Sequence, residues 1–383
     1  MWIYICVIFI SCLLTLIAEK SQKSIRQLFF TISVILPSIV SGARADSVGT
    51  DMHAYIEPMH RFANSIDNYF SFINSNQTLI SGDQVNRFEK GYMTLVYLCS
   101  RISSSLFFDL FISELLIISL TLIALCRFNK KFNISITLGM FVFYMMFFNP
   151  SLNIVRQSLA MSVLIFSYTY LIEDKWIKYT IGVIIAYLFH QTAIIGIIPL
   201  FIYYFIKTDN KYIFKFGGNI KTISSSTIRS ILGSIFIVVF SPILVNIVLS
   251  LTGQTRFQWA YLAAIPAISI NQMIIRLPFV LLLIVQWNSM KDTIQKNFFL
   301  SMLILDLLLS MISGGTNYLL RVAMYPSIYY VFAFPIEVKD SNVNKHILIT
   351  TLIIAYLMVY WYYTVVIMNY NATVPYVYGG FFN

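Results

Sequence analysis

Charged residues are scarce in this sequence. Asp, Glu, Lys and Arg together make up 11% of the chain, whereas a soluble domain carries about 25%. This scarcity excludes a soluble globular protein of ordinary composition. The formal net charge is +10, but no run of five or more Lys and Arg residues occurs, so the basic balance does not indicate a nucleic-acid partner.

Cysteines and common catalytic motifs are also scarce. The four cysteines, Cys6, Cys12, Cys99 and Cys126, lack the spacing of a disulfide framework or of a metal site. His53 and His60 likewise have no partners at metal-ligand spacing. There is no nucleotide-binding loop, G-x-S-x-G, H-E-x-x-H or CxxC motif. The sequence therefore predicts neither a metal nor an organic cofactor.

Long apolar runs are abundant instead. Hydrophobic residues make up 58% of the chain, and the mean hydropathy is +0.77. The runs recur from end to end, which predicts an all-α polytopic membrane protein with about 11–12 transmembrane helices in a single domain, residues 1–383. The first run lacks a basic segment and a small-residue cleavage site, so we expect an uncleaved span. The runs lie at about 2–18, 27–43, 105–126, 134–148, 157–172, 178–206, 230–251, 273–287, 297–313, 321–337 and 347–367.

The run at 178–206 decides the topology. As one helix it would be roughly 43 Å long, which exceeds a hydrocarbon core of about 30 Å. It also contains His190 and Gln191 near its middle. If the chain turns there, every basic loop falls on one side, and the positive-inside rule favours twelve helices with both termini outside. Eleven full spans remain the alternative, because a long helix can tilt.

Residues 44–104 form the one large segment on the outer side. They contain turn sequences such as NSNQ and SGDQ, and amphipathic stretches such as AYIEPMHRFANSIDNYFSFI. A segment of this length predicts a sizeable helical loop on the outer side of the membrane, and not a flexible tether.

Four arginines at the outer ends of predicted helices need a separate explanation. A guanidinium is costly near the membrane, and planar guanidinium groups suit phosphate oxygens. Together they indicate an anionic ligand, although each could instead extend to lipid phosphates. His190 could be a packing residue, and the carboxylates could belong to a turn at Gly49. The outer-side set comprises Arg44, Arg156, Arg276 and Arg321, with Asp46, Asp51 and His190.

Asp109, Glu114 and Asp306 lie inside predicted spans. Two readings stay open for them. They could be proton-relay groups of a transporter, or polar contacts between helices.

Three stretches carry a resemblance to a known family. GARADSVGTDMHAY, after the second run, resembles the R-x(4–5)-G-T-D-x(3)-Y signature of the EpsG-like, Wzy-type polysaccharide polymerases. FNPSLNIVRQSLAMSVLIFSYTYLIEDKWIKYTIGVIIAYLFHQTAII resembles a second element, in which Arg-Gln opens a span and a histidine closes the next. NYLLRVAMYPSIYY, with Arg321 and Tyr325, is similar to a third element.

The resemblance implies an inner-membrane glycosyltransferase with a GT-C-like fold. Such enzymes polymerise repeat units of O-antigen or exopolysaccharide on the periplasmic face. The substrate would be an oligosaccharide linked to undecaprenyl diphosphate in the membrane lipid. The growing chain would move to a hydroxyl of an incoming unit, with no nucleotide sugar and no metal. Whether chain length is set by this protein or by a chain-length regulator protein is left open.

The resemblance and the outer charges together suggest roles for single residues. The leaving diphosphate gains negative charge, which fixed arginines stabilise, and a carboxylate or imidazole can accept the proton of the attacking hydroxyl. Asp46 stands where relatives often have an aromatic or small residue. The predicted roles are diphosphate binding for Arg44, Arg156, Arg321 and, as a fourth, Arg276; proton acceptance for Asp51 or His190, with Asp46 as a further candidate; and substrate orientation for Tyr55, Gln157 and Tyr325.

Other functions compete with this interpretation. A flippase or transporter of the lipid-linked unit would also need basic groups, but it normally shows charges along both halves of a path or an internal repeat. An O-antigen ligase-like transferase would use similar chemistry with another acceptor. A structural scaffold would not need outer arginines.

Overall fold

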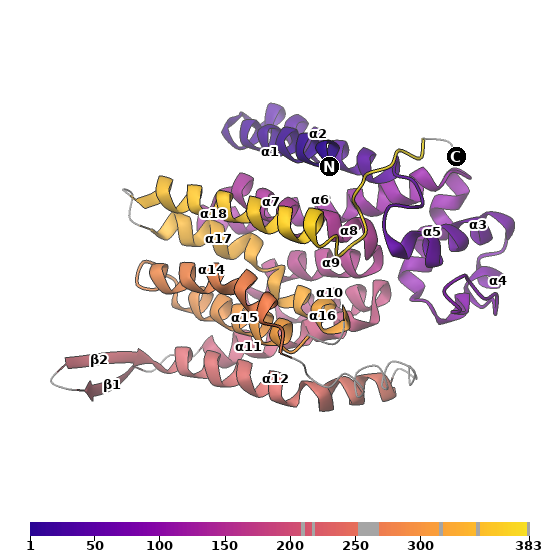
Figure 1. Ribbon diagram of the computed structural model, residues 1–383. Helices are drawn as coiled ribbons and strands as arrows, with labels where there is room; N and C mark the ends of the chain where they lie inside the picture. Colours follow the sequence, from indigo (N-terminus) through magenta and orange to yellow (C-terminus); the bar gives the residue numbers. More distant parts are fainter. Residues whose placement is uncertain (208–210, 217–218, 252–267, 314–316, 342–344, 381–383) are drawn as a thin grey trace. The chain divides into compact units, whose positions relative to one another are not determined.

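The computed structural model describes residues 1–383 apart from 208–210, 217–218, 252–267, 314–316, 342–344 and 381–383. The chain divides into two compact units, which we describe separately: Met1–Ile194 with Ile347–Asn383, and Ile195–His346. Helices dominate the described residues of both units (Figure 1). The predicted all-α polytopic membrane fold is therefore confirmed.

The first unit is a helical bundle with additional short helices between its second and third long helices (Figure 1). Its elements are α1 (Trp2–Lys20), α2 (Lys23–Gly42), η1 (Met52–Ile56), α3 (Glu57–Ser65), α4 (Tyr69–Ile73), η2 (Val85–Arg87), α5 (Lys90–Ile102), α6 (Leu106–Phe132), α7 (Ile136–Phe143), η3 (Tyr144–Phe148), α8 (Asn149–Asn153), α9 (Val155–Leu171), α10 (Trp176–Phe189), α18 (His346–Trp361) and η6 (Tyr362–Ile367).

The second unit is helical apart from one two-stranded hairpin. The strands are antiparallel, with Lys211 opposite Ser224. The hairpin falls within the basic segment that follows the run at 178–206. The 3₁₀-helix η4 (Gln191–Gly196) connects the units. The other elements are α11 (Ile197–Lys207), β1 (Lys211–Phe216), β2 (Asn219–Ser224), α12 (Ser225–Leu251), α14 (Ile270–Gln286), α15 (Thr293–Met311), α16 (Asn317–Ser327) and α17 (Tyr330–Asp340).

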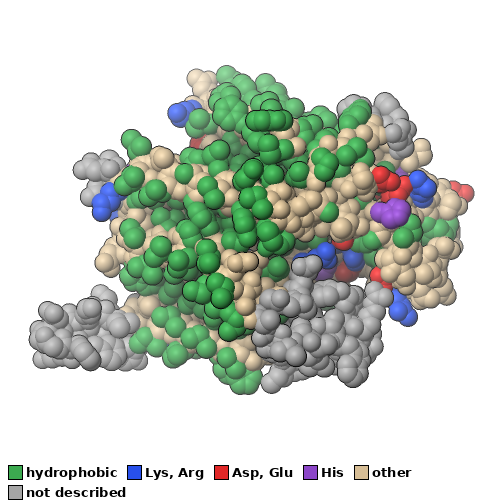
Figure 2. Space-filling model, viewed as in Figure 1, with side chains coloured by type: hydrophobic (Ala, Val, Ile, Leu, Met, Phe, Trp, Pro, Cys, Tyr) green, Lys and Arg blue, Asp and Glu red, His purple; other side chains and the backbone are tan. Residues whose placement is uncertain are grey.

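Several helices have the length and composition of membrane spans. Among the described residues, six apolar segments are long enough to cross a membrane, and four apolar helices are shorter. Their outward surfaces are apolar: Phe9 is 67% exposed and Ile184 is 58% exposed. Figure 2 shows that hydrophobic side chains cover much of one face. The six long segments are Trp2–Lys20, Lys23–Gly42, Leu106–Phe132, Thr293–Met311, Leu319–Asp340 and His346–Ile367.

Both chain termini lie at the same end of the first unit. The Tyr4 hydroxyl, at the start of α1, donates to the carbonyl of Thr373. The C-terminal residues then run beside the end of α2, where Arg44 and Tyr378 form an antiparallel bridge. The end of α2, the start of α1 and the tail therefore share one end of the bundle, which we call the tail end.

The opposite end of this unit carries the basic loops. The carboxylate of Glu19 accepts hydrogen bonds from the first backbone amides of α7, including Ile136 N at 2.9 Å. On the neighbouring helices, Arg127 pairs with Glu173 at 3.0 Å, and the Lys131 ammonium donates to the carbonyl of Ile172. The basic loops after α1, α6 and α9 thus lie together. This arrangement is what the positive-inside rule requires if this end is cytoplasmic.

The apolar run at 178–206 is not one continuous helix. Helix α10 ends at Phe189, and His190 adopts an extended conformation with φ −155° and ψ 124°. Residues Gln191–Gly196 form a 3₁₀-helix before α11 begins. The expected break at His190 and Gln191 is therefore present, and it lies at the tail end.

Residues 44–104 form short helices, as predicted, with a core of their own. Met59, Phe72 and Val96, from α3, α4 and α5, are fully buried. Gly91 lets α5 approach the end of α10 closely, because a Cβ there would lie 2.6 Å from the carbonyl oxygen of Leu188. We call this segment the helical cap. Its contact with α10 brings the cap against the break after Phe189.

Candidate functional site

The loop that joins α2 to the cap is held by the C-terminal tail. The backbone amides of Ala45 and Gly49 donate to the carbonyls of Val377 and Ala372, each at 2.9 Å. Gly49 has φ +96°, a conformation that strains any residue with a side chain. A tight turn at Gly49 therefore directs the following residues into the cap.

Asp51 and Tyr55 are placed by this turn and by the π-helix η1. The side-chain oxygen of Asn153, at the end of α8, accepts hydrogen bonds from the Asp51 amide at 3.0 Å and from the Thr50 hydroxyl at 3.2 Å. The buried Tyr55 hydroxyl donates to Asp51 Oδ2 at 3.0 Å. Burial raises the pKa of this hydroxyl, so it stays protonated and available as a donor. The Asp51 carboxylate is therefore held in position next to a neutral phenol.

Arg156, in the first turn of α9, lies beside the same tyrosine. Its guanidinium carbon is 4.4 Å from the centre of the Tyr55 ring and 4.7 Å from the centre of the Phe88 ring. These distances allow cation–π attraction to both rings. The structure thus brings together three of the predicted site residues, Asp51, Tyr55 and Arg156.

Glu89 is a member of this group that sequence reasoning missed. Its Oε2 lies 2.6 Å from Arg156 Nη1, and its Oε1 accepts the backbone amide of Gln191 at 3.1 Å. Burial by itself raises the pKa of this carboxyl, but Arg156, His190 and the backbone amides of Glu89 and Gln191 together hold it below its usual value. Glu89 lies directly before α5 and outside the three family-like stretches. No motif in the sequence therefore pointed to it.

His190 lies next to this ion pair. Its Nδ1 is 2.7 Å from the Thr192 hydroxyl and 3.3 Å from the Thr192 amide nitrogen. The partly buried imidazole follows α10 directly and precedes the residue whose amide binds Glu89. The second predicted proton acceptor therefore belongs to the same end of the first unit as Asp51.

Gln157 and Arg44, two further predicted site residues, are buried. Gln157 is 2% exposed, and its amide nitrogen lies 3.8 Å from the sulfur of Met161. Arg44 is 4% exposed and donates to the carbonyls of Ser41 at 2.5 Å and Leu152 at 2.9 Å. A guanidinium bonded to carbonyls ends α2 and joins it to α8. In this geometry Arg44 links α2 to α8, and its contact with a diphosphate stays a prediction.

Arg276 belongs to the second unit and is part of a buried polar group. Its Nε lies 3.0 Å from Asp306 Oδ1, and the Tyr330 hydroxyl donates to Asp306 Oδ2 at 2.8 Å. These contacts join α14, α15 and α17, which favours the interhelical reading of Asp306. Arg321 and Tyr325 both lie on α16 of this unit, Arg321 partly buried and Tyr325 4% exposed.

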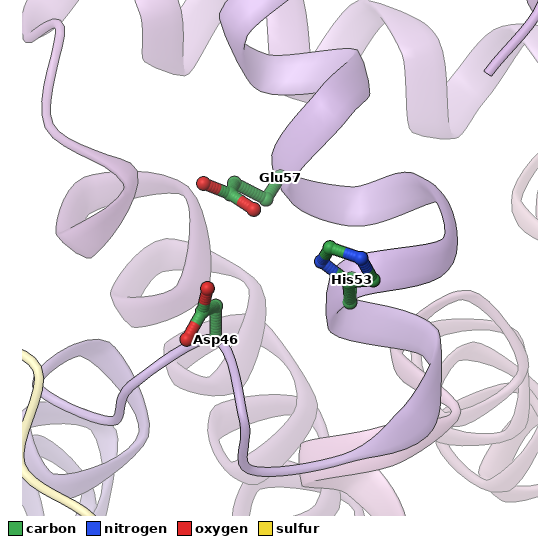
Figure 3. A group of neighbouring side chains, drawn as sticks. All are labelled: Asp46, His53 and Glu57. Atoms are coloured by element: carbon green, nitrogen blue, oxygen red, sulfur yellow. The ribbon is translucent and has the colours of Figure 1, made fainter. Parts of the chain in front are cut away.

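Asp46, the remaining candidate, lies with His53 and Glu57 at the surface of the cap (Figure 3). Potential ligand atoms of the three side chains lie within 4.8 Å of one another, a geometry that a divalent cation could use. However, Asp46 and His53 are exposed, and Glu57 already pairs with Arg61 at 2.5 Å. We therefore interpret this group as a solvated surface cluster.

Comparison with known proteins identifies the family. The sequence model of the EpsG family matches residues 27–378. The chain belongs to the EpsG family. Comparisons with curated proteins and with solved structures found no match. Membership suggests a polysaccharide polymerase-type, glycosyltransferase-like function for this multi-pass membrane protein. It also agrees with the resemblance noted in the first two stretches and in the third, all of which fall inside the matched residues.

Proposed function

We propose that this EpsG-family protein polymerises glycan repeat units carried on undecaprenyl diphosphate. The growing glycan would move from its lipid diphosphate to a hydroxyl of the next lipid-linked unit. The observation that carries the proposal is the position of Arg156, whose guanidinium lies over Tyr55 while the hydroxyl of that tyrosine binds Asp51. A cation thus lies over the face of one aromatic ring and a carboxylate lies at its hydroxyl, an arrangement that suits transfer from a diphosphate.

The chemistry assigns a task to each group. As the acceptor oxygen forms a bond to the anomeric carbon, the bond from that carbon to the phosphate oxygen breaks, and both bonding electrons leave with the diphosphate. Arg156 stabilises this developing charge, an effect worth about 10²–10³ in rate for one well-placed donor. Asp51 accepts the proton of the acceptor hydroxyl, with His190 as the alternative acceptor. The proposed transfer uses no nucleotide sugar and assigns no step to a metal, as the family resemblance implies.

The location of the group also fits a lipid substrate. The group lies at the end of the first unit opposite the basic loops. If those loops are cytoplasmic, as the positive-inside rule favours, this end faces the periplasm. A diphosphate at the headgroup level would meet Arg156 where α9 begins. Tyr55 and Gln157 are proposed to orient the substrate, Gln157 through the packing of α9. In the second unit we propose diphosphate binding for Arg276 and Arg321, and substrate orientation for Tyr325. A chain-length regulator protein is a proposed partner.

The test is a strain that lacks this protein, complemented with variants and analysed for surface polysaccharide on a gel. Arg156→Lys is the informative change. The lysine ammonium can still pair with the Glu89 carboxylate, but it lacks the planar guanidinium that binds two phosphate oxygens at once. We expect Arg156→Lys and Asp51→Asn to leave single repeat units, whereas wild type restores the ladder of polymers. Protein amounts are compared by immunoblot.

Matched controls come from the same cap. Arg61→Lys alters an arginine that is 78% exposed, and Asp67→Asn alters a fully exposed carboxylate, so both should restore the ladder. A ladder of wild-type length from Arg156→Lys would refute the proposed contact with the diphosphate. A deletion strain with no repeat unit at the surface would instead indicate a flippase or a ligase.

A further inference from the structure

Glu89 connects three parts of the chain that are distant in sequence. Glu89 lies in the cap, directly before α5, and its side chain is 8% exposed. One oxygen binds Arg156 at the start of α9, and the other binds the amide that follows His190. A single carboxylate therefore fixes two elements relative to the cap. They are Arg156, which is proposed to bind the diphosphate, and the turn that carries His190, the proposed alternative base.

The contacts of Arg156 differ from those of a structural arginine. Arg44 is held by carbonyl and hydroxyl oxygens and has no carboxylate among its hydrogen-bond partners in the described chain. Arg156 instead has a carboxylate at 2.6 Å and two aromatic rings beside its guanidinium. The Nε atoms of both arginines lack a hydrogen-bond partner among the described residues, so this atom does not distinguish them. The Arg156 side chain is 19% exposed, whereas Arg44 is 4% exposed, so part of Arg156 is open to a ligand.

We propose that Glu89 is a positioning residue that aligns Arg156 and the His190 turn for glycan transfer and limits how tightly the site holds the diphosphate. The inference rests on the proposed function. Two negative groups then share one guanidinium. The carboxylate keeps Arg156 in place between turnovers, and its repulsion of the diphosphate weakens the binding of both substrate and product.

Replacing Glu89 by Gln separates these two effects. The amide oxygen can still accept a hydrogen bond, but the negative charge is lost, so the diphosphate should bind more tightly. Arg156 loses its ionic partner and the geometry of the transfer loosens, and misplacement by about 1 Å can cost about 10²-fold in rate. We therefore expect both KM and kcat to fall. Loss of fold alone would lower kcat without lowering KM.

The experiment uses the purified full-length protein in detergent. The substrate is the lipid-linked repeat unit extracted from the deletion strain, and kcat and KM are measured for wild type, Glu89→Gln and Glu89→Asp. Binding of undecaprenyl diphosphate, the released carrier, is measured on the same samples. We expect Glu89→Gln to lower kcat by at least about 10-fold and to bind undecaprenyl diphosphate more tightly, with Glu89→Asp in between.

Asp67→Asn is the matched control, because Asp67 also pairs with an arginine of the cap, Arg101, but is fully exposed. It should behave as wild type. Unchanged kcat and KM in Glu89→Gln would overturn the inference, as would a lower kcat with a higher KM and weaker binding of the carrier. If Arg156→Lys is also fully active, the proposed function fails. If only Glu89→Gln is active, the positioning role alone fails.

Discussion

The side chain of Asn153 accepts a hydrogen bond from the backbone amide of Asp51, a residue 102 positions earlier in the chain. The first and second family-like stretches therefore meet through an amide oxygen that neither pattern emphasises. Asn153 is 3% exposed, and the same oxygen binds the Thr50 hydroxyl. The position of the Asp51 carboxylate thus depends on the end of α8.

Asn153→Ala should uncouple the two stretches. Two donors would lose their acceptor, which costs about 1–3 kcal/mol when the groups remain buried. We expect shorter polymer ladders and a lower melting temperature of the purified protein. Asn76→Ala, which alters an exposed amide of the cap, is the control. An Asn153→Ala protein with a wild-type ladder would show that Asp51 is held by other contacts.

Tyr55→Phe should test the hydroxyl without disturbing the ring below Arg156. The change removes the 3.0 Å hydrogen bond to Asp51 Oδ2. A hydrogen bond to a charged group contributes about 1.5–3 kcal/mol, so we expect roughly a 10-fold or greater fall in polymerisation rate with little loss of protein. Tyr69→Phe removes a hydroxyl bonded to Thr94 elsewhere in the cap and should be neutral. Equal rates for the two variants would argue against a functional Tyr55–Asp51 contact.

Gly49→Ala should be more damaging than the same change at Gly82. Both glycines have positive φ, +96° and +80°. A Cβ at Gly49 would lie 3.1 Å from the carbonyl oxygen of Leu152, whereas nothing lies within 4 Å of one at Gly82. Both alanine variants would therefore carry backbone strain of about 1 kcal/mol. Only the alanine at position 49 would also crowd its neighbours. The measurement is the polymer ladder together with the amount of folded protein; equal effects would mean that strain alone matters.

The pH dependence of stability should reveal the Glu89–Arg156 pair. Because the folded protein lowers the pKa of Glu89, the pair stabilises the fold fully above the unfolded pKa of about 4.3. This contribution is lost as the pH falls through the lower, folded pKa. The difference in melting temperature between wild type and Glu89→Gln should therefore be constant near neutral pH and shrink only below about pH 4. A difference that shrinks between pH 5 and 7 would contradict the assignment.

Sequence patterns predicted the helices well, and they selected some of the residues that lie together at the candidate site. Apolar runs reveal spans because lipid requires long apolar helices, and the break at His190 followed from length and charge. The motif spacing selected Arg156, Asp51 and Tyr55, which the structure places close together. Glu89 was not predicted, because its partners lie 67 and 102 positions away in α9 and after α10.

Arg44 shows a different limit of sequence reasoning. An arginine at the end of an apolar run can face a ligand or end a helix, and its sequence neighbours are the same in both cases. The structure adds the hydrogen bonds to the carbonyls of Ser41 and Leu152, which the sequence does not indicate. The tail was also unexpected, because backbone hydrogen bonds such as that from Gly49 to Ala372 leave no side-chain pattern.

The contact of the tail with the loop at Gly49 has a consequence for biosynthesis. Residues 372–379, which hold this loop, are synthesised long after the loop itself. The α2–cap loop therefore lacks these backbone partners until residues 372–379 have been made. Chains interrupted before residue 372 would contain the Asp51 turn without the segment that holds it.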